Sequence, residues 1–104
     1  MGINVSHGED FFGEERRSAT TIANLGAYLR SVLTGDDWSR IQFLFDGAFA
    51  DEIAVEPARA REIGNILHSA ANHPRMKRQW AAEAAVFARA ANRAADAGES
   101  WTWS

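Results

Sequence analysis

Apolar residues recur along most of the chain at intervals of three and four positions. Four segments have this pattern, at roughly residues 18–33, 36–46, 57–72 and 75–97. Such spacing gives a helix one apolar face, so each segment is predicted to be an amphipathic helix. We expect Asp36 or Asp37 to cap the second helix and Pro57 to occupy the first turn of the third. Gly35 is predicted to end the first helix in the left-handed conformation, and Gly98 is predicted to end the fourth helix.

Three shorter segments alternate between apolar and polar residues instead. They are residues 3–5, 52–55 and 101–103. A period of two is typical of a strand with one buried face, and it places Trp101 and Trp103 on the same side. Because two exposed tryptophans would favour aggregation, we predict that this tail packs on the helices and pairs with the strand at 3–5. The stretch from residue 6 to residue 17 has no period and is predicted to be a loop.

Together these elements predict a single α+β domain that covers residues 1–104. About four helices would pack with a small sheet formed by the two ends of the chain and a middle strand. The alternative prediction is an all-α domain of four helices with extended ends.

The composition is that of a soluble globular domain, with 46% hydrophobic and 24% charged residues. No window of about 18 apolar residues occurs, so no membrane partner is expected. The first residues also lack the basic and apolar stretches of a secretory signal. The absence of cysteine excludes a disulfide framework and suits a reducing compartment. We therefore expect a cytoplasmic protein.

The formal net charge of −3 conceals an acidic middle and a basic second half. Four arginines of the last predicted helix fall within about 60° of one another at 100° per residue. These residues, which we call the arginine ridge, are Arg75, Arg78, Arg89 and Arg93. Guanidinium groups bind phosphates and carboxylates, so the ridge is a candidate anion-binding surface; the alternative is an ordinary solvated helix face. Because the whole chain is acidic and has no base-reading motif, the sequence disfavours a nucleic-acid partner.

Phe43 lies on the side of the second predicted helix opposite its apolar face. The acidic residues Asp46, Asp51 and Glu52 follow nearby in the sequence. An aromatic side chain with charge of one sign around it is typical of a protein interface. These four residues are therefore a candidate protein-contact surface. The alternative is that the N-terminal loop covers Phe43.

No catalytic or metal-binding pattern emerges from the polar residues. His7, Glu9 and Asp10 have side chains that bind divalent ions, but their spacing matches no known ion-binding loop. His68 and His73 are five residues apart, which turns them to different faces of a helix. The chain has neither a nucleophile elbow nor a glycine-rich phosphate loop. We therefore predict a non-enzymatic module without cofactor or metal that binds another protein or its own copy. An anion- or nucleic-acid-associated protein that uses the arginine ridge is the second hypothesis, and a small enzyme or metal-binding protein is the third.

Several short motifs carry a family resemblance. They are Met-Gly-Ile-Asn-Val-Ser-His-Gly at 1–8, Phe-Phe-Gly-Glu at 11–14, Val-Glu-Pro at 55–57 and Trp-Thr-Trp-Ser at 101–104. With them, the chain resembles a family of small actinobacterial proteins over most of its length. That family has no assigned function, so the resemblance implies no activity, cofactor or functional residue.

Overall fold

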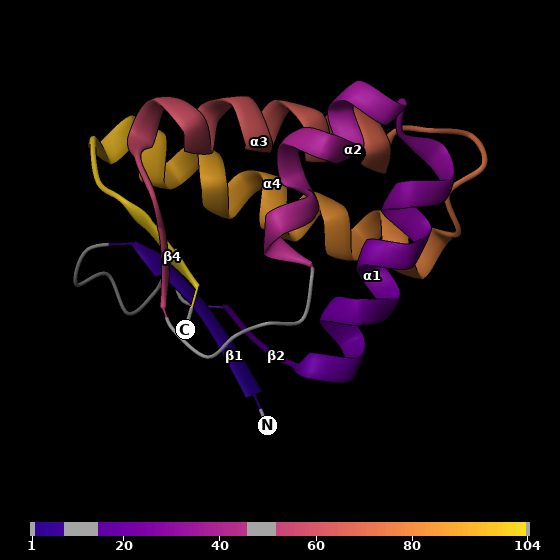
Figure 1. Cartoon of the computed structure of the whole chain (residues 1–104), viewed down its shortest axis with the longest axis horizontal. Helices are drawn as coiled ribbons and strands as arrows, with labels where there is room; N and C mark the ends of the chain where they lie inside the picture. Colours follow the sequence, from indigo (N-terminus) through magenta and orange to yellow (C-terminus); the bar gives the residue numbers. More distant parts are fainter. Residues whose placement is uncertain (1, 8–14, 46–51, 104) are drawn as a thin grey trace.

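Helices and a small sheet form the two sides of the molecule (Figure 1). The computed structural model describes residues 2–7, 15–45 and 52–103. The described strands are β1 (Gly2–His7), β2 (Glu15–Ser18), β3 (Ile53–Val55) and β4 (Trp101–Trp103). The described helices are α1 (Ala19–Val32), α2 (Gly35–Ile41), the short 3-10 helix η2 (Gln42–Leu44), α3 (Pro57–Ala71) and α4 (Arg78–Ala97). The α+β prediction is confirmed, and the all-α alternative is wrong.

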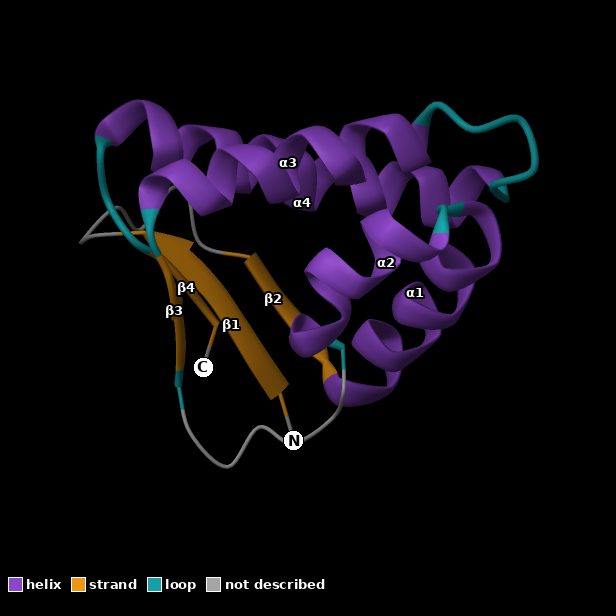
Figure 2. Cartoon of the chain, turned by 45° about the horizontal axis from the view of Figure 1, so that its top comes forward, coloured by secondary structure: helices purple, strands orange, loops and turns teal. Residues whose placement is uncertain are grey.

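The sheet is antiparallel throughout, in the order β2-β1-β4-β3. β4 lies between β1 and β3, with Val5 opposite Trp103 on one side and Ile53 opposite Trp103 on the other. The predicted pairing of the two ends of the chain is therefore confirmed. Trp101 and Trp103 are both fully buried on the face of the sheet that meets the helices. Figure 2 shows this sheet beside the helical layer, with β1 and β4 adjacent.

β2 is a fourth strand that the sequence does not predict: the predicted loop covers residues 15–17, and the first predicted helix begins at residue 18. In β2, Arg17 takes the inward position that an apolar residue occupies in an ordinary strand, and Arg16 takes the outward position. Arg17 is half-buried: its Nε donates to Glu83 Oε2 at 2.7 Å, and its guanidinium carbon lies 5.7 Å from the centre of the Phe87 ring. Arg16 is exposed and donates to Asn4 Oδ1. A long basic side chain covers apolar surface with its stem, which a hydrophobicity pattern does not reveal.

The helix starts and stops differ from the prediction at two places. Thr34, not Asp36 or Asp37, caps α2: its side-chain oxygen accepts from the Asp37 backbone N–H at 3.2 Å. Gly35 is the first residue of α2, and α1 ends at Leu33 in an extended conformation, so the predicted left-handed stop at Gly35 is wrong. Gly98 does end α4 in the left-handed region, with φ 66°.

Two further boundaries also move. α2 ends at Ile41 and continues as η2 only to Leu44, short of the predicted end at 46. α4 begins at Arg78, because the chain turns after Pro74 and Met76 N–H donates to His73 O. Arg75 therefore lies before this helix and not on it.

α3 and α4 run antiparallel and side by side in both views (Figures 1 and 2). They approach closely where Gly64 of α3 faces Asn92 of α4, since a Cβ at Gly64 would lie 2.9 Å from Asn92 Oδ1. Arg61 Nη1 donates to the same Asn92 oxygen and pairs with Asp96. α1 contacts α4 through Tyr28, whose ring stacks on the ring of Trp80 with centroids 5.4 Å apart. α2 lies against α3, where Arg40 pairs with Glu62.

Candidate functional site

An open groove of about 320 Å³ lies between α1 and the α2–η2 segment. Its lining residues are Ala23, Gly26, Ala27, Arg30, Trp38, Gln42 and Phe45. The volume is at the lower end of the roughly 300–1,000 Å³ range of ligand pockets. A groove of this size suits one large side chain better than it suits a nucleotide cofactor.

The floor of the groove is made of small residues on one face of α1. Ala23, Gly26 and Ala27 are three and four positions apart, so they share a helix face next to the buried face formed by Ile22 and Leu25. Gly26 lets Phe45 pack directly against α1. A Cβ at this position would lie 2.9 Å from Phe45 Cβ, so any larger residue would push the two walls apart.

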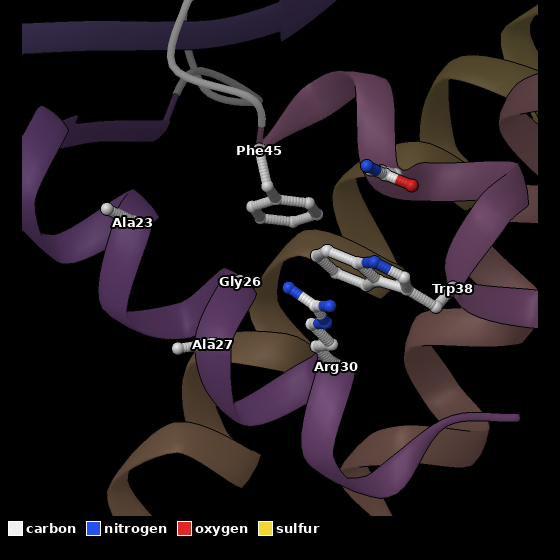
Figure 3. A pocket seen from close by; sticks show the side chains of 7 residues that line it. Ala23, Gly26, Ala27, Arg30, Trp38 and Phe45 are labelled. Carbon is white, nitrogen blue, oxygen red and sulfur yellow. The ribbon is translucent and has the colours of Figure 1, made fainter. Parts of the chain in front are cut away.

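Two aromatic side chains form the opposite wall. Trp38 of α2 and Phe45, which follows η2, are both half-buried and stack with ring centroids 6.0 Å apart and an interplanar angle of 24°. Figure 3 shows both rings projecting toward α1 over the small residues. Phe45 fills the space over Gly26, so the open part of the groove lies over Ala23 and Ala27, beside the two rings.

The wall is held in place by the core. The Phe45 ring meets Trp103 edge-on at 5.7 Å, and Trp103 in turn contacts Phe87 at 5.5 Å and Trp101 at 5.3 Å. These contacts connect the groove to β4 and α4. A wall fixed in this way is already arranged before a ligand arrives, which reduces the entropy lost on binding.

Arg30 supplies the charge of the groove. It is exposed on α1, and its side chain extends into the space toward Trp38 (Figure 3). The structure gives it no hydrogen bond and no ion pair with the residues that it describes. By contrast, Arg17 and Arg61 of the same chain have acidic partners. The groove therefore offers apolar surface together with a guanidinium whose donors are free within the described part of the chain.

The side chains of the groove are those of a recognition site. None of the seven lining residues is a nucleophile or a general acid or base near neutral pH. The described residues contain no group of three or more metal-ligating side chains, and none of their helices is long and apolar enough to cross a membrane. Of the three candidate metal ligands, Glu9 and Asp10 lie outside the described residues.

Phe43, the predicted contact residue, is half-buried. The Arg59 guanidinium carbon lies 5.0 Å from the centre of its ring, and Arg59 Nη2 also donates to Arg40 O at 3.2 Å. Phe43 does not line the groove. Glu52 is exposed, while Asp46 and Asp51 lie outside the described residues. Whether these four residues form one surface thus stays a prediction.

The arginine ridge is partly assembled. Arg78, Arg89 and Arg93 are exposed on α4, while Arg75 is exposed in the turn before it. His68 is exposed on α3, and Asn72 Nδ2 lies 3.3 Å from its Nε2. His73 Nδ1 accepts from the Arg75 backbone N–H. The two histidines therefore have separate local partners.

The groove is not predicted by the sequence. The pattern at residues 36–46 predicts a single helix with one buried face, whereas the chain changes from α2 to η2 there and Trp38 and Phe45 are both half-buried. Two signals were present in the sequence: the small residues at positions 23, 26 and 27, and an arginine at position 30 on the same side of α1. Neither signal shows by itself which helix lies opposite.

The family comparison confirms that the chain belongs to a family without an assigned function. A family described as a domain of unknown function, DUF7739, matches residues 8–104. No curated protein and no solved structure is significantly similar to the chain.

Proposed function

The chain belongs to the DUF7739 family, whose description assigns no activity, and we propose that it is a non-enzymatic module that binds another protein through the α1–α2 groove. The observation that carries this proposal is the aromatic wall of Trp38 and Phe45, which faces a floor of small residues. Tryptophan and arginine are enriched among the residues that dominate interface energies, and both border this groove. Anchoring of the wall to Trp103 adds the rigidity that such binding sites need.

The composition supports a cellular compartment for the protein and a taxonomic range for its family. The absence of cysteine supports a cytoplasmic location, because reducing compartments do not maintain disulfides. Ten of the eleven basic residues are arginine, and alanine is abundant. This usage fits a genome rich in G and C and supports an actinobacterial range for the family.

Site-specific photo-crosslinking tests the proposal. A photoreactive residue is placed at Ala27, on the floor of the groove, and as a control at Ala82, which is exposed on α4. In a lysate of the source organism, Ala27 should yield one dominant protein adduct that Trp38→Ala reduces at least tenfold. Ala82 should not yield it. Equal crosslinking from both positions would contradict the proposal.

Sedimentation separates the two kinds of protein partner. If the dominant adduct is the chain itself, wild type should show a monomer–dimer equilibrium that Trp38→Ala abolishes. In that case the groove is a self-association surface. A monomer at all concentrations, together with an adduct to another protein, identifies a heterologous partner.

A further inference from the structure

The groove combines apolar surface with one charge, and that charge constrains the partner. Of the residues that line it, Arg30 alone is charged. Its guanidinium makes no hydrogen bond or ion pair to the described residues and reaches toward Trp38 (Figure 3). A ligand seated between α1 and the aromatic wall would therefore meet this group directly.

A planar guanidinium binds a carboxylate through two parallel N–H···O bonds. It binds phosphate as well, but phosphopeptide sites gather several arginines around the doubly charged group. Here the other arginines that the structure describes lie outside the groove. One arginine beside an aromatic wall matches one carboxylate beside one apolar group.

The spacing along α1 sets the distance between these two groups. Ala27, an exposed residue of the floor, and Arg30 are three residues apart, which is about 4.5 Å along a helix axis. In an extended chain, residues i and i+2 are about 6.6 Å apart and point to the same side. A strand-like segment can thus place an apolar side chain over Ala27 while a carboxylate within two positions of it meets the long side chain of Arg30.

We propose that the groove binds an extended segment of a partner protein in which an Asp or Glu lies within two residues of an aromatic or branched aliphatic anchor. This inference rests on the proposed function and adds the chemistry of the partner. The anchor packs on Ala27 and Ala23 beside the aromatic wall, and the acidic side chain pairs with Arg30.

Selection from a library of displayed random heptapeptides tests the proposal. The wild-type chain should enrich peptides that contain an apolar anchor and an acidic residue within two positions of it. Arg30→Glu should keep the anchor but replace the acidic residue by Lys or Arg. Trp38→Ala should enrich neither the apolar anchor nor the acidic residue. Arg78→Glu, which makes the same charge change on an exposed arginine outside the groove, should select as wild type does.

A synthetic peptide of the enriched sequence supplies the quantitative measurement. Changing its acidic residue to the uncharged amide should weaken binding to wild type roughly tenfold, as expected for loss of a charge-assisted hydrogen bond. The same change should have no effect on binding to Arg30→Gln. Because Arg30 is exposed, this variant should fold, and its thermal melt should overlay that of wild type.

The outcomes separate the two proposals. If wild type selects an anchor with no acidic preference, or if Arg30→Glu selects the same peptides, the inference is wrong while the groove remains a protein-binding site. If wild type enriches nothing beyond Trp38→Ala, both are wrong. If the chain dimerises through the groove, the occupant is a second copy and the inference is wrong.

Discussion

The ring of Phe45 contacts the indole of Trp103 edge-on, with centroids 5.7 Å apart. This contact joins the wall of the candidate binding groove to the C-terminal strand, which is itself paired with the N-terminal strand. The groove and the sheet are therefore parts of one packed unit. A substitution that disrupts the packing of the sheet should also disrupt the groove.

Removal of residues 100–104 should destabilise the whole domain. Trp101 and Trp103 are fully buried, and β4 lies in the middle of the sheet. Trp103→Ala alone should lower the free energy of unfolding by about 3–5 kcal/mol, the usual effect of truncating a large core residue. Urea denaturation measures this. Thr102→Ala, on the opposite face of the same strand, is the control and should change stability by less than about 1 kcal/mol. An unchanged midpoint after the truncation would contradict the described sheet.

Gly26→Ala should destabilise the chain and distort the groove. The new Cβ would lie 2.9 Å from Phe45 Cβ, an atom close to the backbone that has little freedom to move. Overpacking of this kind lowers the free energy of unfolding by about 1–3 kcal/mol. Ala23→Ser, at an exposed position of the same helix face, should stay within about 0.5 kcal/mol. Chemical denaturation measures the free energy of unfolding of the two variants. Equal values would mean that α1 and Phe45 do not approach as described.

Two glycine substitutions should act in opposite directions. Gly98 has φ 66° at the end of α4, so Gly98→Ala should destabilise the protein by about 1–2 kcal/mol. Gly35 lies in α2, and a Cβ there meets no heavy atom within 4 Å. Gly35→Ala should therefore stabilise the protein by about 0.4–1 kcal/mol, mainly by restricting the unfolded chain. Thermal melts of both variants are compared, and a loss of stability for Gly35→Ala would refute the assigned start of α2.

Phe43→Ser should have an effect between those of a surface and a core substitution. Phe43 is half-buried beneath Arg59, so about 1–2 kcal/mol is expected. A double-mutant cycle with Arg59→Ala should give a coupling of about 0.5–1 kcal/mol, the contribution of an exposed cation–π pair. A cycle without coupling, and a Phe43→Ser variant as stable as wild type, would mean that this ring is free to contact a partner.

The sequence predicts the elements whose hydrophobic pattern is complete by itself. The helices at 57–72 and 75–97 and the strand at 101–103 each place their apolar residues on one face, and each is present. β2 was missed because Arg17 fills an inward position with a charged side chain that pairs with Glu83. The cap of α2 was assigned to Asp36 or Asp37 because several residues near that start are good caps. Only the backbone conformation shows that Thr34 takes the role.

The candidate site was harder to predict than the fold. A groove arises between two elements, and its residues carry no shared motif. Gly26 is small because Phe45 lies against it, yet nothing in the sequence links positions 26 and 45. The helical pattern points instead to Phe43, an aromatic residue opposite the apolar face of its predicted helix and near acidic residues. That hypothesis considered the face of one helix and not the segment that would pack on it.

The most direct measurement of the central claim is an NMR titration of the ¹⁵N-labelled chain. The probe is N-acetyl-glutamyl-tryptophan amide, which carries one carboxylate next to one aromatic side chain; the glutaminyl analogue is its control. At millimolar probe, the amide signals of residues 23–30 and of Trp38 and Phe45 should shift and approach saturation. Signals of exposed α4 residues should not move, and the glutaminyl analogue should bind several-fold more weakly. Shifts that spread over α3 and α4, or groove signals that do not move, would contradict the assignment of this groove as the binding site.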